Sequence, residues 1–440
     1  MKDRIFQFID SNVPLLLELE TELTKRPAIS PDSGGQGELD KCLFLESWLR
    51  ARGIDQLERY DAPDSRAAGG LRPNLIATLR GSDDTLRGSD DTLPGGGASL
   101  PEGKDEGRLW IMSHLDVVPP GEASLWEHDP WQLVERQSGT TPEGKALGRH
   151  VIGRGVEDNQ QGLCSSVLAA LALKNAGVLP RRTVKLLFAA DEENGSAYGI
   201  VWLMKNHRDL FHNNDMVRIP AGGAPTGASI EIAEKNLVWA RFTTKGKQAH
   251  GSRPDQGANA FLAASDLAVA LHYGLSEKFS ARDPLFEPDY STFQPTKKEA
   301  NVPNINTIPG EDVFCMDMRI LPRYPVKEVL AEVDRIKAGI EAKHGVSVSY
   351  SAPQCVESPP TSAEAPLVRA LSRCVREVYQ VETKPVGIGG GTVGACLRVG
   401  GIDSAVWCRI EGTAHQPNEY ALIDNILGDA KVMALLMCSP

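Results

Sequence analysis

Apolar and polar segments alternate in the first half of the chain in a way that predicts strands joined by helices. Mostly apolar runs at 74–81, 108–116 and 183–193 are typical of buried strands. Between the last two, residues 160–176 have helical periodicity, with an apolar face made of Leu163, Val167, Leu168 and Leu171. The order strand, helix, strand predicts an α/β sheet covered by helices.

From about residue 236 the pattern changes and predicts a separate α+β unit. Strand patterns at 236–244, 312–321 and 346–351 are interleaved with helical patterns at 259–273 and 326–345. Alternation along 312–321 puts one set of side chains on the inner face of a sheet, namely Phe314, Met316, Met318 and Ile320. Arg319 is therefore expected to project from the outer face.

A helix at 365–379, a glycine-rich turn at 387–392, a strand at 403–408 and a closing helix return to the α/β pattern. We therefore predict an α/β domain made of residues 1–235 and 352–440, interrupted by a smaller α+β domain at 236–351. The segment TLRGSDD occurs twice in tandem, at 78–84 and 85–91. Its short, polar composition predicts a mobile loop between two strands.

The composition of the 440 residues, 41% hydrophobic and 24% charged, is typical of a soluble globular protein. No apolar run approaches the roughly 18 residues of a membrane span, and the first residues lack the apolar core of a signal peptide. The cytoplasm is the expected location, with no membrane partner. A formal charge of −11 argues against a nucleic-acid partner. The eight cysteines lack paired spacing, so disulfides are not expected.

Several positions in the α/β domain carry side chains suited to metal or acid–base chemistry. They are His114 and Asp116 at a strand end, Asp158 before a helix, Asp191, Glu192 and Glu193 after the next strand, and the late His415. Singly, each has a structural explanation: a strand-end histidine, a helix N-cap, a solvated acidic turn or a loop histidine. Adjacent carboxylates repel one another, however, which favours a bound cation or a raised pKa. Together the side chains offer the mixed ligands typical of zinc, or of cobalt or manganese.

Two further features lie outside this set. His250, in GKQAHGSRPD, is either a surface histidine or a donor that reaches the site of another domain. The turn GIGGGT fails the dinucleotide-binding spacing because Thr392 occupies the last glycine position, and no clear strand precedes it. Both a close approach of the backbone to a substrate and a plain turn remain open for it.

The motifs SHLDVVPPGE, GRGVEDNQQG, DEENGS, GKQAHGSRPD and AHQPNE, taken in order, resemble the M20 family of metallohydrolases over about residues 110–420. The family includes succinyl-diaminopimelate desuccinylase, acetylornithine deacetylase and several dipeptidases. The resemblance implies a mixed-sheet, zinc-peptidase-like catalytic domain and a ferredoxin-like lid or dimerisation domain. It also implies a homodimer that hydrolyses amide bonds in N-acyl amino acids, N-succinyl diamino acids or dipeptides, with one or two zinc ions per chain.

The resemblance also implies roles for the matching residues. The metal ligands would be His114, Asp158, Glu193 and His415, with Asp158 bridging two ions. Asp116 would orient His114, and Glu192 would be the general base that activates water. His250 resembles a lid histidine that stabilises the oxyanion in a partner's site, and Arg319 resembles an arginine that holds the substrate carboxylate. The same pocket would be lined by Asn306, Gly390, Gly391 and Thr392.

Position 221 departs from the family pattern. Relatives with this motif subtype typically read P-D-G-G where this chain has P-A-G-G, with Ala221 in place of the acidic residue. An alanine methyl group cannot bind a metal. We therefore expect one strong site and one weak or empty site, the latter at His114 and Asp158.

Two acidic residues near position 221 in the sequence, Asp215 and Glu231, are not expected to substitute, because a ligand needs a fixed geometry. Two functional hypotheses therefore stay open. One is an active metal-dependent amide hydrolase. The other is a homologue with an impaired metal site that binds but turns over poorly.

Overall fold

A computed structural model describes residues 1–82, 107–141 and 144–439, and it divides into two compact units. The first comprises Met1–Ile232, Thr361–Pro385 and Cys396–Pro440, and the second comprises Ala233–Pro360 and Val386–Ala395. The tandem repeat from residue 83 onward lies outside the described residues. No helix within the described ranges is long and apolar enough to cross a membrane.

These limits differ from the boundaries expected at 235/236 and 351/352. The second unit continues past residue 351 because β16 (Ser347–Val356) stays paired with β11 (Asn236–Lys245) as far as Leu237 and Val356. The segment 386–395 was expected in the α/β domain but groups with the second unit. One reason is that the amide of Lys235 donates to the Ile388 carbonyl at 2.9 Å.

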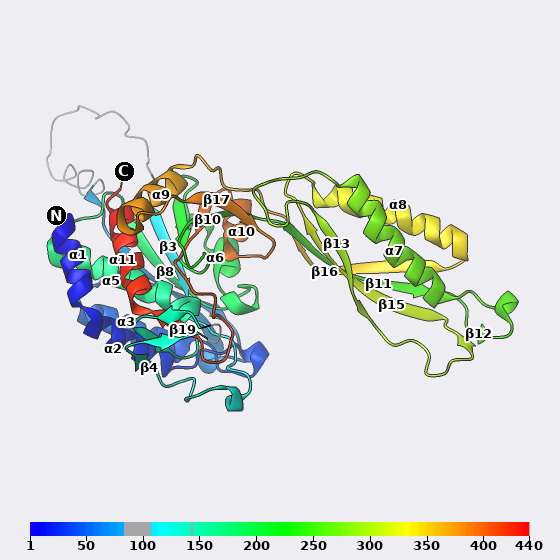
Figure 1. Ribbon diagram of the computed structural model, residues 1–440, viewed down its shortest axis with the longest axis horizontal. Helices are drawn as coiled ribbons and strands as arrows, with labels where there is room; N and C mark the ends of the chain where they lie inside the picture. The colour runs from blue at the N-terminus through cyan, green and yellow to red at the C-terminus, as the bar shows by residue number, and fades with distance from the viewer. Residues whose placement is uncertain (83–106, 142–143, 440) are drawn as a thin grey trace. The chain divides into compact units, whose positions relative to one another are not determined.

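A mixed eight-stranded sheet forms the centre of the first unit (Figure 1), in the order β1-β2-β8-β3-β9-β18-β10-β17. In that order the strands are Leu57–Pro63, Leu71–Leu79, Val184–Ala189, Leu109–His114, Met216–Ile219, Asp403–Val406, Ser229–Glu234 and Lys384–Ile388. The neighbours β8 and β3, β3 and β9, and β9 and β18 all pair in parallel. The segments that follow these four strands therefore leave the same edge of the sheet, where α/β folds place their ligands.

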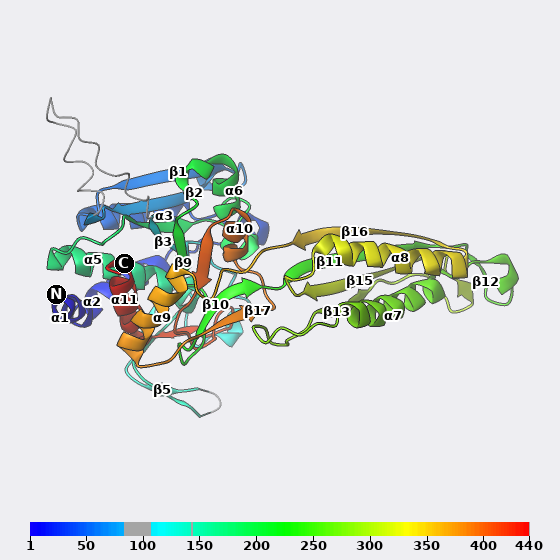
Figure 2. The same cartoon turned by 90° about the horizontal axis from the view of Figure 1, so that it is seen from above.

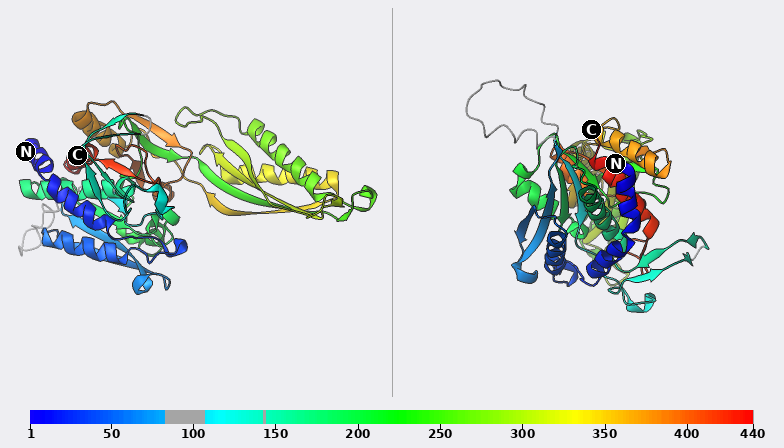
Figure 3. Two further views of the ribbon diagram at one scale, coloured as in Figure 1. Left: turned by 60° about the horizontal axis from the view of Figure 1, so that its bottom comes forward. Right: turned by 90° about the vertical axis from the view of Figure 1, so that its left-hand side faces the viewer.

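Helices cover this sheet. They are α1 (Lys2–Ser11), α2 (Val13–Thr24), α3 (Leu39–Ala51), α5 (Gln161–Ala176), α6 (Ile200–Asn206), α9 (Pro366–Tyr379), α10 (Val393–Val399) and α11 (Ile423–Met437). Helix α5 packs on β3 and β8 and is flanked by α1 and α11 (Figure 3), so almost all of its residues are buried instead of the single predicted face. The polar side chains of Ser165 and Ser166 are accommodated because each donates to a carbonyl one turn earlier.

Short strands surround the carboxyl edge of the large sheet. They are β4 (Val134–Arg136), β5 (Gly139–Thr140), β6 (Ala146–Leu147), β7 (His150–Ile152) and β19 (Tyr420–Leu422).

The glycine turn at 387–392 was expected to lack a preceding strand, and this was wrong. Strand β17 ends at Ile388, and its sequence KPVGI hid it because Pro385 and Gly387 are weak strand formers.

The second unit has the predicted ferredoxin-like order. After β11 come α7 (Ala260–Lys278), β13 (Thr292–Lys298), β15 (Glu311–Ile320), α8 (Val326–His344) and β16. The sheet order β13-β15-β11-β16 is antiparallel throughout, and α7 and α8 cover one face (Figure 2). The inward set predicted from alternation along β15 is buried in this core, namely Phe314, Met316, Met318 and Ile320. A separate pair, β12 (Ala249–His250) and β14 (Thr307–Ile308), lies beyond the sheet.

Candidate metal centre

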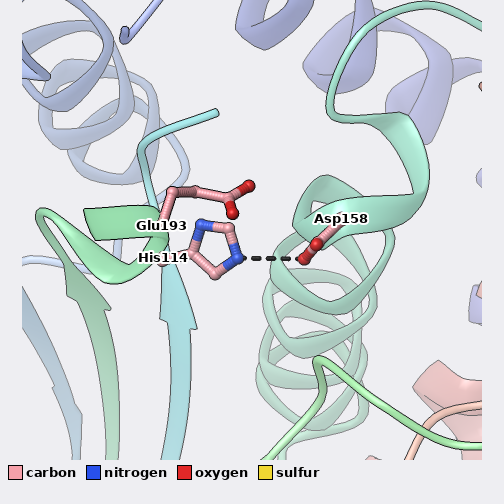
Figure 4. A group of neighbouring side chains, drawn as sticks. All are labelled: His114, Asp158 and Glu193. Atoms are coloured by element: carbon pink, nitrogen blue, oxygen red, sulfur yellow. Dashed lines mark hydrogen bonds and ion pairs between the residues drawn. The ribbon is translucent and has the colours of Figure 1, made fainter. Parts of the chain in front are cut away.

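All four metal ligands implied by the sequence meet at the carboxyl edge of the parallel strands. Asp158 Oδ1 lies 3.0 Å from His114 Nε2, and Asp158 Oδ2 lies 3.2 Å from His415 Nε2. His415 Nε2 is also 3.1 Å from Glu193 Oε2. Figure 4 shows His114, Asp158 and Glu193 around a common space, and one ligand atom from each lies within 4.8 Å of the others.

Asp158 lies in a turn between β7 and α5 and faces the imidazoles instead of capping the helix. His114 is oriented through Nδ1, which lies 3.0 Å from the main-chain oxygen of Asp116 and 3.4 Å from its Oδ1. The Asp116 carboxylate also accepts the amides of Glu192 and Glu193, both at 3.0 Å. Asp116 therefore orients the first ligand and the acidic pair after β8 together.

The charges in this cluster shift the pKa values of His114, His415 and Asp158. Burial alone would lower the pKa of His114, but its contacts with Asp116 and Asp158 raise it well above the usual value. Asp158 and Glu193 likewise raise the pKa of His415 to about 10. The pKa of Asp158 is lowered by the two imidazoles, against the effect of burial. A potential negative enough to hold protons on both imidazoles also favours a divalent cation.

Glu192 has the properties of a general base. Burial raises its pKa to about 7, and the nearby Asp158, Asp116 and Glu193 add to that effect against the opposing charge of His114. A carboxylate with a pKa near the working pH both accepts and returns a proton effectively. The neighbouring Glu193 is directed toward the candidate ligands instead, because one of its oxygens contacts His415.

The donor set fits a divalent metal ion. Two imidazole nitrogens and two carboxylates suit zinc, cobalt or manganese. Glu193 Oε1 is buried and has no hydrogen-bond partner among the described residues. A buried acceptor of this kind is costly unless it is paired, and a cation would pair it.

Two constraints put residue 221 beside the first ligand. Strand β3 pairs with β9 at a constant offset of 107 residues, from Leu109 with Met216 to Ile111 with Arg218. The pairing itself ends at Ile111 and Arg218, and continuing its offset by three residues would set Ala221 opposite His114, beyond the end of β9 at Ile219. The Asn159 side chain also accepts from the His114 amide at 3.1 Å and donates to the Pro220 carbonyl at 2.8 Å. The alanine thus stands where a third ligand for the His114 side of the cluster was expected.

Neither of the nearby acidic residues joins the ligand group within the described part of the chain. Asp215 pairs with Arg108 and accepts from Trp110 Nε1, each at 2.8 Å. Glu231, on β10, faces the backbone of Gly222, where both of its oxygens would lie within 3.2 Å of an added Cβ.

In the second unit, Arg319 lies beside the glycine turn. Its Nε and Nη2 donate to the Asp317 carboxylate at 2.7 and 2.9 Å, and Nη1 donates to the Gly389 carbonyl at 2.7 Å. Thr392 Oγ1 contacts Glu234 within the same unit. A Cβ added at Gly391 would meet no atom within 4 Å, and one at Gly390 would meet only Ile388 at 3.8 Å. Crowding within the chain therefore does not require glycine there.

His250 and Asn306 form a second group in this unit. The amide of Gly251 donates to the Asn306 carbonyl at 2.7 Å, and His250 Nδ1 lies 2.9 Å from Ser252 Oγ on the exposed surface. This group follows the end of the sheet where Lys245 pairs with Glu311. Arg319 pairs with Leu237 at the opposite end. The second unit therefore presents two separate groups of candidate residues.

Two residues that face the ligand segments were missed from the sequence. Glu157 and Glu419 are buried carboxylates within the motifs GRGVEDNQQG and AHQPNE. The only signal was an acidic residue next to or shortly after a proposed ligand. Their partners are main-chain amides far away in the sequence, which no local pattern identifies.

Known proteins match the whole chain. A family model for peptidase family M20/M25/M40 matches residues 110–439. The chain is 33% identical over 437 residues to an uncharacterized metallohydrolase of Methanococcus maripaludis, covering 94% of this chain and 97% of that protein. A dipeptidase structure from Saccharomyces cerevisiae superposes with a TM-score of 0.67 at 16% identity over 99% and 98% of the two chains. A dinuclear metal-binding peptidase from Bacillus subtilis gives a TM-score of 0.63 at 15% identity over 98% of both. With the ligand cluster in place, the chain belongs to peptidase family M20/M25/M40, as a metal-binding hydrolase of peptide or amide bonds.

Proposed function

We propose that the protein hydrolyses the amide bond of a small substrate with a free carboxylate. The substrate class is an N-acyl amino acid, an N-succinyl diamino acid or a dipeptide. The observation that carries this proposal is the convergence of His114, Asp158, Glu193 and His415 beside Glu192. The guanidinium of Arg319 supports the requirement for a carboxylate.

The chain's own residues account for the proton transfers. A divalent ion, proposed to be zinc with cobalt or manganese as alternatives, supplies Lewis acidity to water and the scissile carbonyl when bound. Glu192 takes the proton from the attacking water and later returns it to the leaving amine, for which a pKa of about 7 is well suited. Asp116 holds the backbone of Glu192 and so keeps its carboxylate in register with the ligands.

The carboxylate of the substrate is assigned to Arg319. Asp317 and the Gly389 carbonyl take up Nε and one N–H on each of the two Nη atoms. A guanidinium has five N–H groups, so one N–H remains on each Nη for a carboxylate. The turn at Gly390, Gly391 and Thr392 is proposed to approach the substrate with its backbone.

We also propose a homodimer in which His250 and Asn306 serve the site of the partner. Strand β15 separates these residues from Arg319, because Glu311 and Arg319 lie at opposite ends of the β11–β15 pairing. At a strand rise of about 3.3 Å per residue, the two ends are roughly 26 Å apart. A dipeptide-sized substrate does not span that length, so one copy of the unit does not bring both groups to one substrate.

A second candidate function rests on Ala221. With a methyl group beside His114, the chain has three ligands for one ion but only His114 and Asp158 for another. We propose one strong and one weak metal site. In the extreme case of this proposal, the protein binds metal and substrate but hydrolyses the substrate poorly.

A direct comparison with the Ala221→Asp variant tests both candidates. Hydrolysis of a panel of N-acyl amino acids and dipeptides is measured with zinc, cobalt and manganese, and bound metal is counted by elemental analysis. We expect the parent to retain about one tightly held ion and the variant about two. Two tight ions in the parent would contradict the assignment of position 221, and no hydrolysis by either protein would contradict the proposed reaction.

A further inference from the structure

Two buried carboxylates outside the ligand set connect the segments that carry Asp158 and His415. Glu157 immediately precedes Asp158, and Glu419 follows His415 by four residues. Their side chains belong to residues that are only 3% and 0% exposed. Asp158 lies in a single π-helical turn, Val156–Gln160, and residues 411–419 form no regular helix or strand. Amides at the start of such a turn and in a loop need partners outside regular secondary structure.

Glu157 accepts hydrogen bonds from the segment that leads to His415. Its Oε1 accepts from the amides of Glu411 at 2.5 Å and Gly412 at 3.1 Å. Its Oε2 accepts from the Thr413 amide, from Thr413 Oγ1 at 3.0 Å and from the Ala414 amide at 2.9 Å. One carboxylate therefore holds four consecutive amides, up to the residue before the ligand.

Glu419 does the same for the segment of Asp158. Its Oε1 accepts from the amides of Glu157 at 2.9 Å and Asp158 at 3.0 Å. Its Oε2 accepts from the Gly155 amide at 3.0 Å and from Arg154 Nη1 at 2.6 Å. The amide of the ligand Asp158 is thus fixed by a side chain from the other ligand's segment.

The two sets of contacts are reciprocal. The segment of Asp158 supplies the carboxylate that orders the backbone before His415, and the segment of His415 supplies the carboxylate that orders the backbone of Asp158. His415 has a φ of 65°, a left-handed conformation that is uncommon for residues other than glycine. The contacts of Glu157 with residues 411–414 order the backbone directly before it.

We propose that Glu157 and Glu419 are reciprocal positioning residues that set the affinity of the cation held jointly by Asp158 and His415. Both oxygens of each carboxylate accept hydrogen bonds from the opposite segment or its neighbours. Each acts by fixing the backbone from which the opposite ligand projects, because a ligand that must be ordered on binding loses affinity. This proposal rests on the metal site of the proposed function but not on turnover.

The test is a zinc titration of the metal-free protein, followed by calorimetry, for the parent and for Glu157→Gln. Glutamine is nearly the same size but has one NH2 group, which would face amide donors already directed at that position. We expect the Kd for the tightly bound Zn²⁺ to rise by about 10- to 100-fold. A change of less than about twofold in a folded Glu157→Gln variant would overturn the proposal.

Glu411→Gln is the matched control. It makes the same chemical change within the segment that Glu157 contacts, but among the described residues the Glu411 side chain pairs with Lys145 and with no main-chain amide. Its zinc affinity should equal that of the parent. An equal loss in Glu411→Gln would show that any change of charge on the loop weakens binding and would overturn the specific assignment.

Glu419→Gln and the double variant test the reciprocal part. If the two carboxylates act as one unit, the double variant loses much less affinity than the product of the two single losses. Independent, multiplicative losses would overturn the reciprocal arrangement. Circular dichroism of the metal-free proteins separates folding from affinity: unfolding of both single variants before zinc is added would assign the carboxylates to the fold instead. Because no substrate is used, an inactive parent does not affect the outcome.

Discussion

The two units place their candidate functional side chains in contrasting ways. In the first unit, candidate ligands from distant segments meet where the parallel strands of the mixed sheet end, as when Asp158 contacts His114 across 44 positions. In the second unit, His250 and Arg319 lie at opposite ends of one antiparallel sheet, and His250 is exposed. The first unit therefore gathers its candidate residues in one place, whereas the second unit holds its candidate residues apart.

The units also differ in their treatment of carboxylates. In the first unit, burial raises the pKa of Glu192 and of Glu231 to about 7. The second unit pairs the buried Glu332 with Arg335 and Lys278, which lower its pKa to about 2. An acid with a raised pKa suits catalysis, whereas an acid paired with two cations stays ionised.

The largest effect is expected when Glu192 is replaced in one chain and His250 is replaced in the other chain of a dimer. Glu192→Gln and His250→Ala should each lower kcat by about 100-fold or more, because one removes the base and the other a donor to the oxyanion. If His250 serves the partner's site, co-expressing the two inactive variants should restore roughly a quarter of the parent activity. Half of randomly assembled dimers are mixed, and one of their two sites is complete.

Activity of the co-expressed pair is the readout, with sedimentation confirming mixed dimers. The control mixes Glu192→Gln with a Glu192→Gln and His250→Ala double variant, which leaves no complete site in any arrangement. An inactive mixed dimer of the two single variants would mean that His250 acts within its own chain, whereas full activity of His250→Ala by itself would mean that His250 does not act. Sedimentation that shows only monomer at working concentration would also contradict the proposal that His250 serves the site of a partner chain.

A smaller effect is expected at Arg319. Arg319→Lys keeps the charge but loses the paired N–H groups, so KM for substrates with a carboxylate should rise about 10-fold, with a smaller change in kcat. Initial rates on one N-acyl amino acid and on its carboxamide provide the comparison. The carboxamide should be hydrolysed equally by parent and variant. Equal losses on both substrates would remove Arg319 from carboxylate recognition.

The smallest effect concerns pH and stability. The pKa of Glu231 in the folded chain is about 7, above the ordinary 4.5, so the folded state keeps a proton that the unfolded state has released. Stability therefore falls as pH rises from about 4.5 to 7 and stays lower above that range. Glu231→Gln removes this loss, and its Tm should exceed that of the parent by a few degrees at pH 8 and by less at pH 5.

Glu332→Gln in the second unit is the matched control for that measurement. The pKa of Glu332 is lowered, so its contribution is present above about 4.5 and is lost only as pH falls toward 2. Its variant should lower Tm by the same amount at pH 5 and pH 8. A pH-independent effect of Glu231→Gln would contradict the raised pKa of Glu231.

Much of this protein follows from local sequence patterns. Alternation along 312–321 identified the buried face of β15, because side-chain direction in a strand depends only on position parity. The order of strands and helices from residue 236 predicted the ferredoxin-like unit. The motif residues His114, Asp158, Glu193 and His415 were recognisable because each follows or precedes a regular element.

Position 221 shows what the pairing of two strands adds to the information in a sequence motif. The resemblance implied that the ligand missing at position 221 belongs with His114 and Asp158, but no short pattern shows which segments connect to that position. The pairing of β3 with β9 and the hydrogen bonds of Asn159 to the His114 amide and the Pro220 carbonyl connect the two segments. Strand pairing between distant segments is not encoded in any short pattern, so this information exists only in the folded chain.

The sequence by itself determined most of the elements, the likeness to a family and the candidate ligands. Only the tertiary structure decided that β8, β3, β9 and β18 are parallel neighbours, which is why their carboxyl ends bring the ligands to one place. It also decided the contacts of Glu157 and Glu419, which accept from main-chain amides more than 250 residues away. An amide has no sequence signature, because every residue except proline carries one, and only folding selects which carboxylate meets it.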